Sequence, residues 1–124
     1  MHLVLKSSGT LGGAHVNGVL VAAPTFVKDN PAITAAVLAA QNEANGFIRA
    51  NPADAAAIYI ALAKDTHGVE AMTKMIVDPD NIWTTVPQKS MMFAAFMHKV
   101  GRLKHMPASW KDIFLANVQA GHGS

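Results

Sequence analysis

The residues best suited to holding a ligand lie near the start of the chain, where glycines and hydroxyl side chains occur together. Residues 9–13 read Gly-Thr-Leu-Gly-Gly, and Ser7 and Ser8 precede them. Glycine adopts left-handed backbone conformations without steric cost, so such a loop can turn its N–H groups toward an anion. His15 follows and offers a hydrogen-bond donor. The segment lacks the Gly-Lys-Ser/Thr ending of a nucleotide P-loop, which leaves two interpretations, an anion cradle and a plain strand-to-strand turn.

Metal binding and catalysis find less support. The chain has six histidines, but no two of them are four residues apart as in the helical H-E-x-x-H zinc motif. The absence of cysteine excludes disulfides, thiolate ligands and cysteine nucleophiles. No serine lies in a nucleophile-elbow pattern, and Asp65 with His67 is typical of an exposed turn. We therefore predict no catalytic residue, no metal site and no cofactor, and we do not expect an enzyme.

Two short strands should position the glycine loop. Residues 3–5 and 16–22 are apolar and rich in β-branched side chains, which is typical of buried strands. From Pro24 onward the pattern is helical. The sequence thus predicts an α/β fragment that is predominantly helical, with two short N-terminal strands followed by four to five helices. We expect a division into residues 1–24 and residues 25–124.

Several local signals mark the helices. Asn30-Pro31 and Asn51-Pro52 each combine a capping side chain with proline at the first helical position. Further helices are predicted over residues 69–76, after Pro87, and at Ser109-Trp110-Lys111-Asp112, which has the spacing of a capping box. Residues 121–124 are expected to form a flexible tail. The first long helix carries an apolar stripe that we expect to be buried, formed by Ile33, Val37, Ala40, Ala44, Phe47 and Ile48.

Composition excludes several functional classes. The 10 Lys and Arg residues exceed the 8 Asp and Glu residues by only two and are scattered singly, which argues against nucleic-acid binding. Hydrophobic residues make up 51% of the chain and charged residues 15%, so intrinsic disorder is not expected. The apolar run near residues 16–26 is interrupted by Gly18 and Pro24 and is too short for a membrane span. The first residues also lack the pattern of a signal peptide.

Many segments of the chain resemble one family. The most specific is the block of residues 84–97 followed by Pro107-Ala108-Ser109-Trp110-Lys111-Asp112-Ile113-Phe114 and Gly123-Ser124. Together these segments are similar to the carboxy-terminal portion of substrate-binding proteins of nitrate/sulfonate/taurine-type ABC importers. Earlier segments contribute as well, namely Leu3-Val4-Leu5-Lys6-Ser7-Ser8, Leu11-Gly12-Gly13-Ala14-His15, Asn30-Pro31, Ala44 with Phe47-Ile48, Asn51-Pro52 and Val100-Gly101.

The resemblance implies the type II periplasmic-binding fold, in which a solute lies in a cleft between two α/β lobes. Residues 1–24 would end the second lobe and form the hinge crossover strands, and residues 25–124 would be the C-terminal helical part of the first lobe. The implied ligand is a small oxyanion such as nitrate, sulfonate, taurine or bicarbonate, and the implied partner is an ABC permease. The implied ligand-binding residues are Ser7, Ser8, Thr10 and His15. The implied location is periplasmic or lipid-anchored.

The same resemblance predicts an oligomer. Helices of such a lobe normally cover a parallel sheet, and most of that sheet is not in this sequence. Large exposed apolar faces drive association, so we expect the chain, if folded alone, to form a dimer or higher oligomer. The alternative interpretation is a stand-alone helical oligomerisation or interaction module with no ligand cleft.

Overall fold

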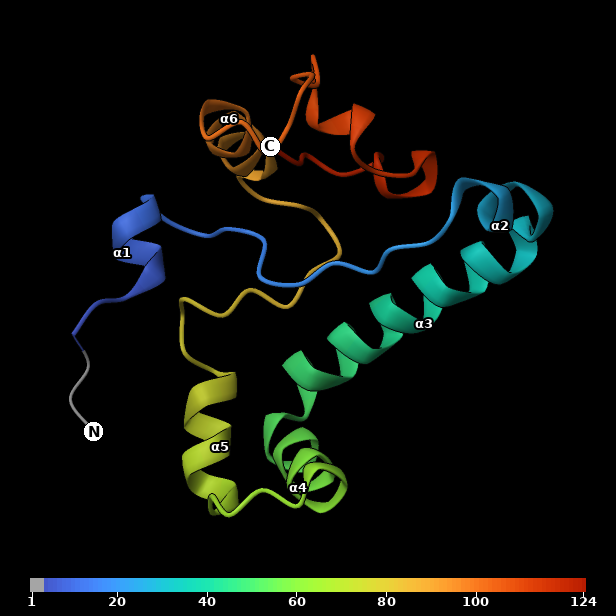
Figure 1. Cartoon of the computed structure of the whole chain (residues 1–124). Coiled ribbons are helices and arrows are strands. Elements are labelled where there is room, and N and C mark those ends of the chain that lie inside the picture. Colours follow the sequence, from blue (N-terminus) through green and yellow to red (C-terminus); the bar gives the residue numbers. More distant parts are fainter. Residues whose placement is uncertain (1–3) are drawn as a thin grey trace. The chain divides into compact units, whose positions relative to one another are not determined.

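The computed structural model describes residues 4–124, and regular structure in this range is helical. The elements are α1 (Ser7–Leu11), α2 (Pro24–Asp29), α3 (Pro31–Ala50), α4 (Pro52–Ala63), α5 (Val69–Ile76) and α6 (Ser90–Lys99), followed by the 3-10 turns η1 (Trp110–Asp112) and η2 (Ala116–Val118) (Figure 1). The chain forms two units, which are described separately below. One comprises the chain up to Leu38 together with Thr85–Ser124, and the other is Ala39–Thr84.

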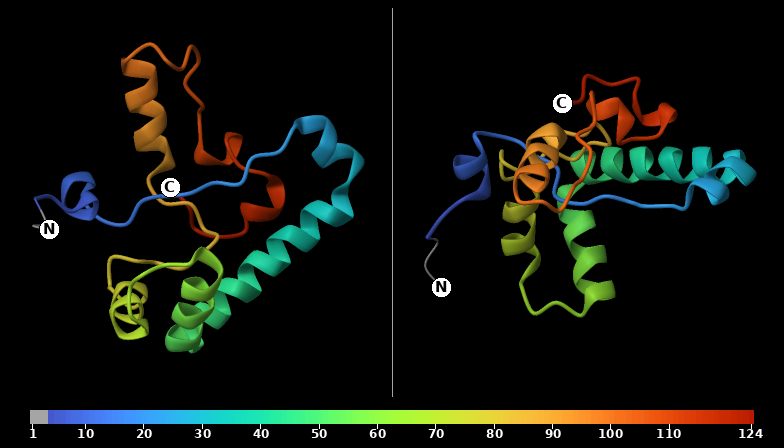
Figure 2. Two further views of the ribbon diagram at one scale, coloured as in Figure 1. Left: turned by 60° about the horizontal axis from the view of Figure 1, so that its bottom comes forward. Right: turned by 45° about the horizontal axis from the view of Figure 1, so that its top comes forward.

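The predicted α/β class is wrong, because no strand occurs within residues 4–124. The first predicted strand, residues 3–5, lies partly outside the described residues, and Val4 and Leu5 are 92% and 71% exposed. Residues 16–22 run as an irregular trace from α1 to α2 (Figures 1 and 2). A strand needs a neighbour to pair its backbone N–H and C=O groups. Neither Val4-Leu5 nor residues 16–22 pair with such a neighbour in the described part of the chain.

Residues 7–13, predicted as a loop, instead begin with helix α1. The helix ends at Gly12, whose φ of 73° lies in the left-handed region that a helix terminus favours. Glycine therefore ends a helix here, whereas both interpretations of residues 9–13, the anion cradle and the turn between strands, predict a loop.

The predicted starts of the two long helices are confirmed. Helix α3 begins at Pro31 and α4 at Pro52, because proline at the first position gives up no helical hydrogen bond. The preceding asparagines act differently from the prediction. The Asn30 side-chain amide donates to the Phe26 carbonyl at 2.9 Å, and the Asn51 amide donates to the Phe47 carbonyl at 3.4 Å. Each asparagine therefore caps the end of the helix before it.

In the unit Ala39–Thr84, α4 and α5 pack against each other. Ala56 on α4 is fully buried. The Trp83 indole N–H donates to the Ile76 carbonyl at 3.0 Å, which satisfies an open carbonyl at the end of α5. The Arg49 guanidinium donates to the Trp83 carbonyl, which links α3 to the segment that follows α5.

In the other unit, the C-terminal segment is attached to the start of α6, and the expected flexible tail is therefore docked. The Ser124 carbonyl accepts hydrogen bonds from the Ser90 N–H at 2.7 Å and the Ser90 hydroxyl at 2.6 Å. The Ser124 N–H donates to the Pro87 carbonyl at 3.0 Å. A Cβ atom at Gly123 would lie 3.0 Å from the Pro87 oxygen and from the Trp110 ring, so only glycine fits without displacement.

The predicted burial of the α3 stripe is also corrected. Ile33 and Val37 are 51% and 48% exposed. Among the apolar side chains of residues 4–124, only Ala56, Pro87 and Ala94 are buried. The helical periodicity is present, but residues 4–124 form no sheet that could cover the stripe.

Candidate functional site

Helix α1 holds three of the four predicted ligand-binding residues. Ser7 and Thr10 are exposed and Ser8 is half-buried. The Thr10 hydroxyl donates to the Lys6 carbonyl at 3.1 Å, inside its own helix. A helix this short is marginal in water without tertiary contacts, so its position depends on what holds its ends.

The C-terminal end of α1 is held by Lys89. The Lys89 ammonium donates to the Leu11 carbonyl at 2.7 Å and also to the Gly12 carbonyl. The Gly13 N–H donates back to the Ser8 carbonyl at 2.7 Å. The segment thus turns carbonyl oxygens toward a cation, which is the reverse of the N–H array that an anion needs.

Sequence reasoning missed Lys89 for a physical reason. It lies 78 positions from Leu11, and no local pattern marks the pair. Its backbone is left-handed, with φ of 54°, which is uncommon for a residue other than glycine. Its N–H donates to the Ser124 hydroxyl at 3.0 Å. Lys89 therefore joins α1, the start of α6 and the C-terminal segment.

His15, the fourth predicted ligand-binding residue, is half-buried just beyond the glycines. Its Nδ1 lies 3.2 Å from the Gly13 carbonyl oxygen, an arrangement in which Nδ1 carries the proton and donates. Its ring is tilted against Phe93, with ring centres 6.2 Å apart. In this tautomer Nε2 is an acceptor, so a ligand could use it only as an acceptor unless the ring is protonated.

A shallow groove of about 300 Å³ lies in the same unit. Two of its lining residues, Val16 and Val19, come from the extended segment, and Arg102 supplies a charged group. The predicted ligand-binding residues do not line it. The structure therefore brings Ser7, Ser8 and Thr10 together on one short helix but does not place them with His15 around this groove. The remaining lining residues are Ser90, Ala94, Met97, Leu103, Ile113 and Phe114.

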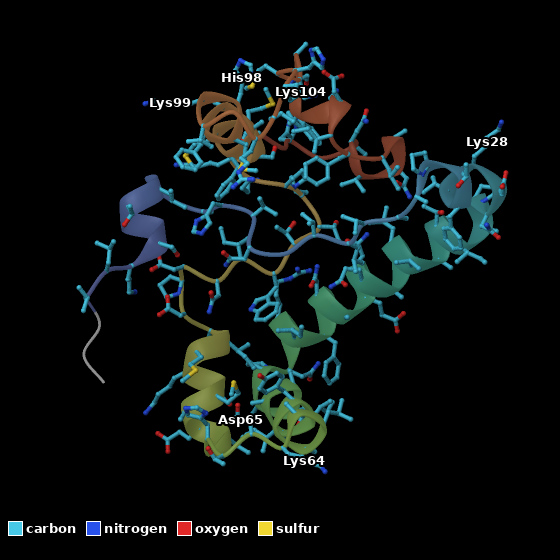
Figure 3. The ribbon with its side chains drawn as sticks, viewed as in Figure 1. Lys28, Lys64, Asp65, His98, Lys99 and Lys104 are labelled. Atoms are coloured by element: carbon cyan, nitrogen blue, oxygen red, sulfur yellow. The ribbon has the colours of Figure 1, made fainter. Side chains whose placement is uncertain are left out.

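Asp65 and His67 form the closest acid–imidazole pair that the described chain offers. The Asp65 carboxylate lies 2.5 Å from His67 Nδ1 and accepts the His67 backbone N–H at 2.8 Å. The backbone hydrogen bond, followed by the side-chain one, lowers the pKa of Asp65. Figure 3 shows Asp65 next to Lys64 at the end of α4. No hydroxyl nucleophile hydrogen-bonds to this pair in residues 4–124.

Residues 4–124 offer neither a metal-binding cluster nor a membrane-spanning helix. No cluster of three or more His, Asp or Glu side chains is positioned to hold a metal ion. None of the described helices combines the length and the apolar composition required to cross a bilayer.

Comparisons with family models, with curated proteins and with solved structures find no significant match to this chain.

Proposed function

We propose that the chain is part of the solute-binding component of an ABC importer for a small oxyanion such as nitrate, sulfonate, taurine or bicarbonate. It would correspond to the carboxy-terminal portion of such a protein, and binding followed by presentation to the permease would be its work. No chemical step is required of it. The proposal starts from the sequence resemblance and is supported by two features of the fold.

The packing of the most specific segments is the observation that carries the proposal. Pro87, Trp110 and the terminal Gly123-Ser124 are far apart in sequence but lie together. Gly123 fits against Trp110 where a Cβ would not, and Ser124 bonds both Pro87 and Ser90. A resemblance at scattered positions gains weight when those positions depend on one another physically.

The second supporting feature is the incomplete burial of apolar side chains. Val19, Leu20 and Val21 are 61%, 77% and 89% exposed, and the α3 stripe is half exposed as well. Uncovered apolar side chains on an extended segment and on a helix would be expected of a chain that packs against further parts of a larger protein.

The ligand-binding residues we propose are Ser7, Ser8, Thr10 and His15. Hydroxyl groups donate to oxyanions without adding charge, and protonated histidine would add a charge-assisted donor. The Thr10 hydroxyl would exchange its bond to the Lys6 carbonyl for one to the ligand. Lys89 is a positioning residue here, because its ammonium is engaged with the carbonyls that end α1.

Thermal unfolding in the presence of candidate solutes tests the proposal. Nitrate, taurine, methanesulfonate and bicarbonate would be compared with chloride at equal ionic strength. A ligand at 100 times its dissociation constant should add about 2.7 kcal/mol to the free energy of unfolding. One of these oxyanions should raise the melting temperature and chloride should not. If none of them raises it, the proposal fails for this chain.

A matched pair of variants locates the binding site. The hydroxyls of Thr10 and Thr73 each donate to the carbonyl four residues earlier, at 3.1 Å and 2.7 Å. Thr10→Val and Thr73→Val therefore remove the same intrahelical bond, but only the first removes a proposed ligand donor. The ligand-induced shift should shrink in Thr10→Val and persist in Thr73→Val.

The second candidate function is a stand-alone helical interaction module without a ligand cleft. The same exposed apolar side chains favour it, because patches of this kind mark protein–protein contact sites. It predicts self-association that no oxyanion alters.

A further inference from the structure

Residues 17–22 are an unpaired, uncharged, strand-forming segment. They read Asn-Gly-Val-Leu-Val-Ala, and the structure gives their backbone groups no hydrogen bond within residues 4–124. The flanking residues are anchored, since the Val16 N–H donates to the Gln88 carbonyl at 2.9 Å and the Ala23 carbonyl accepts from the Val27 N–H at 3.1 Å. The segment is therefore held at both ends, and its backbone groups are unpaired between them.

The chemistry of this open stretch specifies what can cover it. Unpaired backbone N–H and C=O groups can be satisfied by an extended backbone that lies alongside them. The side chains agree, since Val19, Leu20 and Val21 are largely exposed and suit a pleated neighbour. Apolar contact alone would leave the polar backbone groups unpaired.

Charge then favours a second copy of the same segment. No charged residue occurs between Lys6 and Lys28, so two copies can pair without placing like charges opposite each other. Natural edge strands are usually protected from self-pairing by lysine, proline or a bulge. Within residues 17–22 none of the charged or proline protections is present, and Pro24 lies beyond the open stretch.

We infer that two copies of this chain associate through antiparallel pairing of residues 17–22 about a two-fold axis. Six paired residues span about 20 Å of strand. A contact of this length buries less surface area than a standard stable interface. We therefore expect a reversible dimer that forms at micromolar concentrations. The inference does not rest on the proposed solute, because it needs only the open backbone and the neutral segment.

Sedimentation equilibrium from 1 to 200 µM tests this pairing with two matched leucine variants. Leu20 and Leu62 are similarly exposed, at 77% and 81%, but only Leu20 lies in the segment. Leu20→Lys places two ammonium groups near each other across the axis and should weaken the dimer at least tenfold. Leu62→Lys on α4 should leave it unchanged. Far-UV circular dichroism on both variants verifies that the helices are retained.

Cysteine crosslinking supplies a second, independent readout. The chain contains no cysteine, so single Cys variants at each of residues 17–22 report on that position alone. Antiparallel pairing brings only the residues at the axis opposite their own copies, within reach of a disulfide. The crosslinking yield should peak at one position or two adjacent ones, with Leu62→Cys as the low reference.

Each contrary result overturns the inference. A wild-type chain that stays monomeric at 200 µM leaves the segment to some other occupant. A dimer that resists Leu20→Lys, or a crosslinking yield that is flat across residues 17–22, places the contact on another surface. An oxyanion-dependent thermal shift in a monomeric chain would support the proposed function and refute only the pairing.

Discussion

Asp65 should make the local stability of the α4–α5 turn depend on pH. Its hydrogen bonds from His67 hold the pKa of the carboxyl below the ordinary value of 3.8. A carboxyl whose pKa is lower in the folded state stabilises that state above its unfolded pKa, and this contribution is lost as the pH falls through the folded pKa. The turn should therefore be tightest above about pH 4, near the ordinary aspartate value.

A carboxyl titration followed by NMR measures this effect. The Asp65 midpoint should fall below 3.8 in the wild type. In His67→Ala the midpoint should move up only part of the way, because the largest cause is the backbone N–H of residue 67, which the substitution keeps. A wild-type midpoint at or above the ordinary value would contradict the hydrogen-bonded geometry.

At the scale of single residues, the sequence predicted what local spacing determines. The capping box at Ser109 is confirmed, with the Ser109 N–H donating to Asp112 at 2.9 Å, because its partners are three residues apart. The contact of Lys89 with Leu11 was not predictable, since the two residues are 78 positions apart and no local pattern links them. The ligand-binding roles of Ser7, Ser8, Thr10 and His15 stay predictions.

At the scale of elements, α1 should depend on Lys89 for its order. Lys89→Met keeps the length of the side chain but removes the ammonium from the Leu11 and Gly12 carbonyls. Loss of a charge-assisted hydrogen bond at a half-buried site should cost about 1 kcal/mol. Amide exchange should then accelerate at N–H groups that α1 protects, among them those of Thr10, Gly12 and Gly13.

Lys64→Met is the control for this change. Lys64 has nearly the same left-handed backbone as Lys89, with φ of 51° against 54°, but it lies at the end of α4. Its substitution tests the same chemistry away from α1. Equal acceleration of Thr10 and Gly13 exchange in both variants would show that Lys89 has no specific role there.

Elements whose sequence signals lie within their own residues were predicted correctly, and elements that depend on distant partners were not. Helices α3 and α4 begin at the predicted Asn-Pro pairs, and α5 is predicted by the apolar spacing of its own residues. The structure confirms all three helices. The prediction of strands was wrong because residues 16–22 have strand composition but no pairing partner among the described residues. A β-strand forms only when its backbone hydrogen-bonds to a neighbouring strand. The predicted burial of the α3 stripe was wrong for a similar reason, because periodicity predicts which face of α3 is apolar but not what covers that face.

For the whole molecule, unfolding by urea should be shallow at low concentration. The slope of stability against denaturant scales with the surface exposed on unfolding, and few apolar side chains of residues 4–124 are buried. At 1 µM we expect a slope below the usual range of about 1–3 kcal/mol per molar urea. At 200 µM both the slope and the midpoint should rise, because association buries further surface.

Circular dichroism at the two protein concentrations measures the slope and the midpoint. Leu20→Lys should remove the concentration dependence, whereas Leu62→Lys should keep it. A slope within the usual range that is the same at both concentrations would mean that the chain completes its core alone.

The link between Lys89 and the end of α1 also orders the events of folding. Helices α4 and α5 are neighbours in sequence and can pack as soon as both exist, whereas α1 waits for a residue 78 positions later. Contacts across long separations form late, since their loops must close first. During synthesis, α1 is therefore the earliest of the described helices to leave the ribosome and among the last to be secured. The open segment beside it stays accessible to chaperones and proteases throughout that interval.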